Sequence, residues 1–154
     1  MTSTYNDIYS RFLIKIRDYE FAGLPEPNAT EQMKEWLQAS LSHTYIYRIF
    51  KTFSADDEVA EIEYTLKSTV DEYSDTNFVE ELLGNAMVIE WVTPKLQTTT
   101  LLNQMITNSK EQKFYAQANH VSQLRELKAE TETKVRSMLR DKGYIYNSYL
   151  GNNI

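Results

Sequence analysis

The residues that could carry out chemistry are few and widely spaced. The chain of 154 residues has no cysteine and only two histidines, His43 and His120. The lack of cysteine excludes disulfides, thiolate metal ligands and cysteine nucleophiles. Neither histidine has a second histidine or a glutamate at the spacing that places two ligands on one face of a helix, so a metal site would have to combine remote parts of the chain. We therefore expect no bound metal.

Carboxylates, glycines and serines give no stronger signal. The acidic run 54–58 (SADDE) lacks the glycine and the spaced oxygens of a calcium loop, and a solvated turn explains it better. The four glycines form no phosphate-binding loop, and no serine has a histidine partner in a recognisable motif. Glu90, within the apolar run MVIEWV, is expected to be a paired structural carboxylate. The sequence therefore predicts no catalytic residue and no cofactor.

Charge is distributed unevenly along the chain, whose formal net charge is −6. Residues 1–109 carry eight Lys and Arg against seventeen Asp and Glu, whereas residues 110–154 carry eight against five. An acidic body and a basic C-terminal part permit head-to-tail association of identical copies, and they argue against a protein that binds nucleic acid over its whole surface. The alternative is a surface of uneven charge that has no partner.

Length and composition indicate one globular domain. A single core commonly holds about 100–200 residues, so a second domain would lack a core of its own. The chain is 42% hydrophobic and 25% charged, and no apolar run approaches the ~18 residues needed to cross a bilayer. The first residues have no basic region followed by an apolar one, so we expect no secretory signal, no membrane partner and synthesis in a cytoplasm.

The richest apolar stretch is 78–96 (FVEELLGNAMVIEWVTPKL). Its second half has almost no polar stripe, which predicts a central, largely buried helix. Asn77 with Glu80 resembles a capping box at the start of this helix, and Pro94 predicts its end. We expect the core to form around residues of this helix and of a later one: Phe78, Leu82, Leu83, Met87, Trp91, Phe114 and Val121.

Two helices and a β-hairpin are expected before the central helix. Residues 4–21 have apolar side chains at helical spacing, and a second helix is expected from Asn28 after a turn that contains two prolines. From Thr44 aromatic and β-branched residues favour a strand, and residues 61–67 alternate polar and apolar side chains. The pattern predicts a hairpin over about 44–67. Residues 57–67 also fit a short helix, and both alternatives stay open.

After the central helix the pattern predicts a short helix over 101–106 and a long one over 113–142, with Gly143 as its stop. Residues 143–154 contain tyrosines and aliphatic residues but no charged side chain, so this tail should be docked on its own subunit or on a partner. The predicted fold is mainly α: one helical domain over 1–142, made of about five helices with a small β-hairpin insertion, and an extended C-terminal docking tail over 143–154.

Two groups of residues are candidates for a partner interface. Cations of the long helix could meet an acidic surface, and the aromatic and aliphatic residues of the tail could fill an apolar one. In chain order the candidates are Arg125, Lys128, Lys134, Arg136, Tyr144, Ile145, Tyr146, Tyr149, Leu150 and Ile154.

Several segments together resemble one protein family. They are 85–91 (NAMVIEW), Pro94 with Lys95, 113–120 (KFYAQANH) and 124–127 (LREL), together with 49–53 (IFKTF) and the acidic residues 56–58. This combination is similar to the head-to-tail connector, or adaptor, proteins at the neck of tailed bacteriophages of Gram-positive hosts. The similarity covers nearly the whole chain.

The resemblance implies a mostly helical, non-enzymatic virion protein. It would form a homo-oligomeric ring, expected to be dodecameric, that joins the portal protein to the next neck or tail component. DNA would pass through the ring without sequence-specific binding. The family has no catalytic residues to carry over to this chain. One alternative is a soluble, non-enzymatic regulatory or adaptor protein that binds one protein partner through its aromatic tail, and another is an enzyme with a site of scattered carboxylates.

Overall fold

The computed structural model describes the backbone of residues 1–16, 21, 24–105 and 111–144, and the side chains of 1–16, 21, 24–98 and 120–143. In chain order the elements are β1 (Thr2–Thr4), α1 (Tyr5–Lys15), α3 (Glu26–Leu41), the 3-10 helix η1 (Thr44–Ile49), β2 (Phe50–Asp56), β3 (Glu61–Leu66), α4 (Glu72–Met105) and α5 (Glu111–Tyr144). The predicted mainly α fold class is confirmed. The tail over 145–154 lies outside the described residues.

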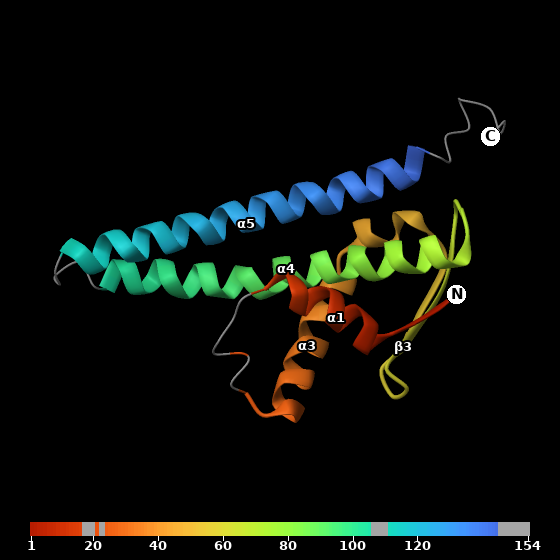
Figure 1. Ribbon diagram of the computed structural model, residues 1–154, viewed down its shortest axis with the longest axis horizontal. Helices are drawn as coiled ribbons and strands as arrows, with labels where there is room; N and C mark the ends of the chain where they lie inside the picture. The colour runs from red at the N-terminus through yellow and green to blue at the C-terminus, as the bar shows by residue number, and fades with distance from the viewer. Residues whose placement is uncertain (17–20, 22–23, 106–110, 145–154) are drawn as a thin grey trace.

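Helix α4 is the axis of the fold. Helices α4 and α5 lie side by side and antiparallel along the long axis, while α1 and α3 pack on α4 over part of its length (Figure 1). Between Val79 and Val92 nearly every side chain of α4 is buried. A helix that is hydrophobic all round must be covered on all sides, and α1, α3 and α5 all pack against α4.

Most of the residues predicted for the core lie in it. Those that are buried are Leu82, Leu83, Met87, Trp91 and Val121. Phe78 is partly buried and packs against the core, whereas the side chain of Phe114 lies outside the described part. The core also takes in three buried residues of β3, Ile62, Tyr64 and Leu66, and the apolar face of α1.

Both predicted ends of the central helix are wrong. Helix α4 begins at Glu72, and Asp71 caps it: the Ser74 N–H donates to Asp71 Oδ1 at 2.9 Å. Asn77 lies inside the helix, where its amide oxygen accepts a hydrogen bond from Arg11. Residues 72–76, which precede the predicted start, therefore form about the first turn and a half of the helix.

Pro94 also lies inside α4, and the predicted short helix over 101–106 is the continuation of α4 as far as Met105. A proline within a helix removes one backbone hydrogen bond and costs about 3 kcal/mol. Buried Trp91 and Val92 before the proline, and partly buried Leu96 after it, pack against the core on both sides of this break. Their burial offsets the cost, since each large apolar side chain contributes roughly 1.5–3 kcal/mol.

The start of the predicted hairpin is wrong as well. Residues Thr44–Ile49 form η1, and the first hairpin strand begins at Phe50. Ile46 and Ile49 are buried, and their spacing of three places them on one side of a helix with three residues per turn. The aromatic and β-branched residues that favoured a strand therefore lie in a 3-10 helix, with the isoleucines buried and the tyrosines exposed.

The sheet has the order β1-β3-β2, with both pairs antiparallel. Of the two alternatives for 57–67, the strand is correct over Glu61–Leu66, and its alternation places Ile62 and Tyr64 toward the core. Strand β1 was not predicted, because a three-residue polar segment has no pattern. Thr4 ends β1 and also caps α1, since its hydroxyl accepts from the Asp7 N–H at 3.2 Å.

Three helix boundaries differ from those predicted. Helix α1 stops at Lys15, because Ile16 adopts an extended conformation, and so it is shorter than the predicted 4–21. Helix α3 begins at Glu26, before Asn28, since a proline is tolerated in the first turn of a helix. Helix α5 runs through Gly143 to Tyr144, so Gly143 is not its stop.

A buried ion pair joins the start of α4 to the end of α5. Lys142 Nζ donates to Asp75 Oδ1 at 2.6 Å, and these side chains are only 9% and 2% exposed. The Val70 N–H donates to the other carboxylate oxygen at 3.0 Å, and the Lys142 ammonium lies 5.2 Å from the ring centre of Phe78. Because a buried charge without its partner is strongly destabilising, this pair fixes the register of α5 against α4.

Gly84 permits the closest approach of α1 to α4. A Cβ atom at Gly84 would lie 2.8 Å from Arg11 Cβ and 3.2 Å from the Phe12 backbone nitrogen, whereas one at Gly143 would meet nothing within 4 Å.

We expect Gly84→Ala to lower the free energy of unfolding by about 1–3 kcal/mol, because α1 must move away. Gly143→Ala is the matched control and should be neutral or stabilising by up to about 1 kcal/mol. Urea denaturation checks both, and a Gly84→Ala protein as stable as the wild type would contradict the packing described.

Candidate partner-binding surfaces

The four predicted interface cations of α5 have different surroundings. Arg125 and Arg136 are exposed and form no ion pair with the described residues. Lys134 Nζ donates to Glu81 Oε1 at 3.3 Å, and Lys128 Nζ lies 4.0 Å from Glu132 one turn further along the helix. Only the two arginines therefore remain available to a partner.

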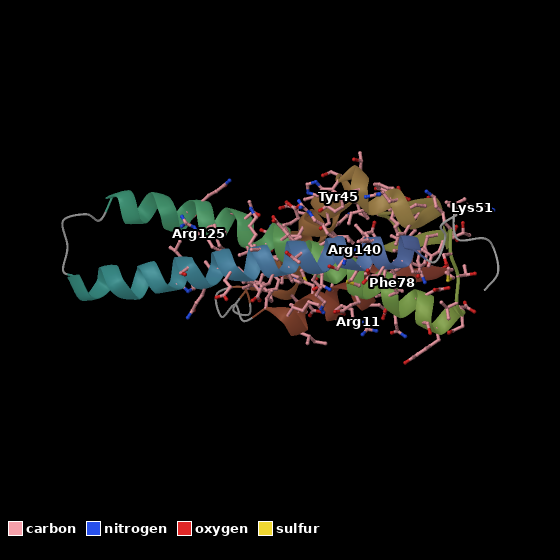
Figure 2. All side chains as sticks on the ribbon, turned by 90° about the horizontal axis from the view of Figure 1, so that it is seen from above. Arg11, Tyr45, Lys51, Phe78, Arg125 and Arg140 are labelled. Carbon is pink, nitrogen blue, oxygen red and sulfur yellow. The ribbon has the colours of Figure 1, made fainter. Side chains whose placement is uncertain are left out.

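These two arginines lie on one side of α5 together with Arg140, whose Nε lies 3.4 Å from Asp141 Oδ1. At about 100° per residue, Arg136 lies roughly 20° round the helix from Arg125, and Arg140 roughly 40° further. Lys134 lies roughly 160° from Arg136, which is why it reaches α4 instead. Figure 2 shows Arg125 and Arg140 well apart along α5. We call Arg125, Arg136 and Arg140 the arginine stripe. Arg140 was missed, although its spacing of four from Arg136 could have indicated it.

A cluster of polar rings lies beside the stripe. His43 Nε2 and Glu90 Oε1 are 2.6 Å apart, so the partner of Glu90 is a histidine that follows α3. The His43 ring stacks on Tyr45 with ring centres 5.4 Å apart. Burial raises the pKa of Tyr45, and the charge of Glu90 adds to this, while nearby Arg136 opposes it. The cluster joins η1 to α4 and borders the stripe, and its phenol stays protonated at neutral pH.

Glu81 is the meeting point of α1, α4 and α5. Lys15 Nζ of α1 lies 2.9 Å from its carboxylate, Lys134 of α5 approaches the same group, and Asn85 Nδ2 donates to it at 3.2 Å. Burial raises the pKa of Glu81, but the hydrogen bond and the charge of Lys15, helped by Lys134 and Asn85, outweigh burial and hold this pKa below its usual value. Glu81 is therefore a structural carboxylate.

The acidic hairpin turn is held rigidly by α1 and α3. The Tyr5 hydroxyl donates to Asp57 Oδ1 at 2.5 Å, and Gln38 donates to Asp57 Oδ2 at 2.9 Å. The Tyr5 N–H also donates to the carbonyl of Ala60, which adopts a positive φ of 59°. The hydrogen bond from Tyr5 lowers the pKa of Asp57. The exposed carboxylates of this turn thus project from a fixed position.

The remaining candidates are metal ligands, a membrane-spanning helix, His120 and the residues of the tail. Within the described residues no group of three or more His, Cys, Asp or Glu could hold a metal ion, and no helix there is long and apolar enough to cross a membrane. His120 is exposed on α5. The backbone of Tyr144 ends α5, and its side chain lies outside the described part together with the other tail candidates: Ile145, Tyr146, Tyr149, Leu150 and Ile154.

Comparison with protein-family models, with curated proteins and with solved structures found no match for this chain.

The lowered pKa of Glu81 predicts a dependence of stability on pH. A carboxyl group whose pKa is lower in the folded state contributes stability that is present above its unfolded pKa of about 4.3 and is lost as the pH falls through the folded pKa. We expect Glu81→Gln to lower the free energy of unfolding at pH 7 by about 1 kcal/mol, and the difference from the wild type to shrink below about pH 4. Urea denaturation across this pH range tests it, with exposed Glu130→Gln as the control. A difference that stays constant with pH would assign the loss to packing.

Proposed function

We propose that this protein is a non-enzymatic subunit of a ring at the neck of a tailed bacteriophage, where it joins the portal to the next tail component. The ring surrounds the DNA channel, and its copies associate head to tail. The proposal begins from the resemblance of 85–91, Pro94 with Lys95, 113–120 and 124–127, together with 49–53 and 56–58, to connector proteins. The surface charges of the fold support it.

The observation that carries the proposal is the arginine stripe. Its arginines span residues 125–140, a rise of about 22 Å at 1.5 Å per residue, and Arg125 and Arg136 have no ion pair with the described residues of their own chain. The acidic hairpin turn, held by Tyr5 and Gln38, presents the opposite charge from a different element. Two complementary, non-identical surfaces on one chain are what a heterologous contact requires, and such a contact closes into a ring when its rotation allows.

The shape of the molecule is consistent with this role. Helices α4 and α5 extend together beyond α1, α3 and the sheet (Figure 1). Each helix has 34 residues, so the pair is about 50 Å long at 1.5 Å per residue. A long paired rod with a compact body at one end offers separate surfaces to a neighbour in the ring and to the component above or below it.

Neutralising the stripe tests the proposal. We expect Arg125→Gln with Arg136→Gln to weaken association with the portal, or between copies, by about tenfold or more, and to reduce the salt dependence of association. Native mass spectrometry of the protein alone and mixed with the portal of its phage measures this. The matched control, Lys128→Gln with Lys134→Gln, removes the same charge from the same helix at residues already paired within the chain, and association should change by no more than about threefold.

Equal losses in the two variants would mean that only the total charge matters, and would contradict the role given to the stripe. A wild-type protein that stays monomeric and does not bind the portal would overturn the neck assignment, and would favour the regulatory or adaptor protein instead.

A further inference from the structure

A cavity of about 250 Å³ lies at the foot of the hairpin, where η1, the end of β3 and the last turn of α5 meet. The described residues that line it are Arg48, Ile49, Lys67, Ser68, Lys142 and Gly143. Two of these lining residues are joined by a backbone hydrogen bond from the Lys67 N–H to the Ile49 carbonyl at 2.9 Å. Three separate elements thus contribute to one hollow.

The cavity carries positive charge that the described part of the chain does not neutralise. No carboxylate is among its described lining residues. Lys142 is neutralised by Asp75, whereas Arg48 and Lys67 are exposed and form no ion pair with the described residues. The partial negative charge at the end of α5 offsets part of this charge, since a helix carries about half an elementary charge at its C-terminus. More than one positive charge therefore remains.

Ser68 supplies the second observation. Ser68 lines the cavity and is only 8% exposed, and its hydroxyl makes no hydrogen bond to the described residues. Buried hydroxyl groups in folded proteins nearly always have a partner, and burying one without a partner costs free energy. A hydroxyl donor and two cationic donors thus border the same hollow, and all three lack an acceptor within the described residues.

We propose that this cavity binds a phosphate group. A phosphate offers three or more acceptor oxygens and up to two negative charges, which matches two cations and a hydroxyl, whereas a carboxylate offers two oxygens and one charge. Arg48 supplies the planar guanidinium that suits bidentate binding of phosphate, and Lys67 adds a second charge. The volume holds a phosphate with several waters, since one water occupies about 30 Å³ of the liquid. This site is independent of the neck assignment.

Titration of the full-length protein with inorganic phosphate, in a chloride buffer of fixed ionic strength, tests the proposal by calorimetry and amide NMR. We expect binding with shifts centred on Ser68 and Gly143. A parallel titration with a short DNA duplex that lacks terminal phosphates identifies the source. Binding of both ligands assigns the site to the backbone of a nucleic acid, and binding of inorganic phosphate alone assigns it to a free phosphate or a phosphate monoester.

Two variants locate the site. Arg48→Gln with Lys67→Gln should weaken phosphate binding by at least about tenfold, whereas Lys128→Gln with Lys134→Gln removes the same charge elsewhere and should leave it within about twofold. Ser68→Ala should weaken binding without lowering the melting temperature of the phosphate-free protein, because the hydroxyl has no partner to lose. No binding by the wild type, equal weakening in the two double variants, or a Ser68→Ala protein that melts lower without phosphate would each overturn the proposal.

Discussion

The fold depends on covering a helix that has no polar face. From Val79 to Val92, α4 buries apolar side chains in every direction, and no single neighbour can cover them. Helices α1, α3 and α5 each take part of its circumference, and Gly84 lets α1 come closest. The helix also continues past Pro94, and partly buried Leu96 packs against the core beyond it.

The carboxylates of α4 assign each neighbour its position. Asp75 binds Lys142 of α5, Glu80 lies 3.5 Å from the Arg11 guanidinium of α1, and Glu90 meets His43 after α3. Glu81 takes Lys15 from α1 and Lys134 from α5. Hydrophobic packing is not directional, so these polar contacts select one arrangement among those that would bury a similar area. Part of the charge asymmetry of the chain is therefore used inside the molecule, and only the remainder is available to partners.

The sequence predicted what local pattern determines and missed what distant contacts determine. The buried middle of α4, strand β3 and the long basic helix follow from periodicity. The ends of α4 do not follow from periodicity. Asn77 accepts a hydrogen bond from Arg11, a residue of another helix, and does not cap α4. Among the interface candidates, the sequence indicated the set of cations but not their roles. Lys134 and Arg136 are only two residues apart, but Lys134 pairs with Glu81 of another helix, whereas Arg136 stays available to a partner. The His43 and Glu90 contact spans 47 residues and has no local signal.

The buried pair of Asp75 and Lys142 has a consequence for the order in which the chain is made. The two residues are 67 positions apart, and Lys142 lies in the last turn of α5. The chain is made from its N-terminus, so α1, α3, the sheet and α4 leave the ribosome before α5 does. Until then one side of α4 is exposed, and Asp75 has no cation. That side of α4 is covered only when α5 docks, and the closing of this ion pair marks that step.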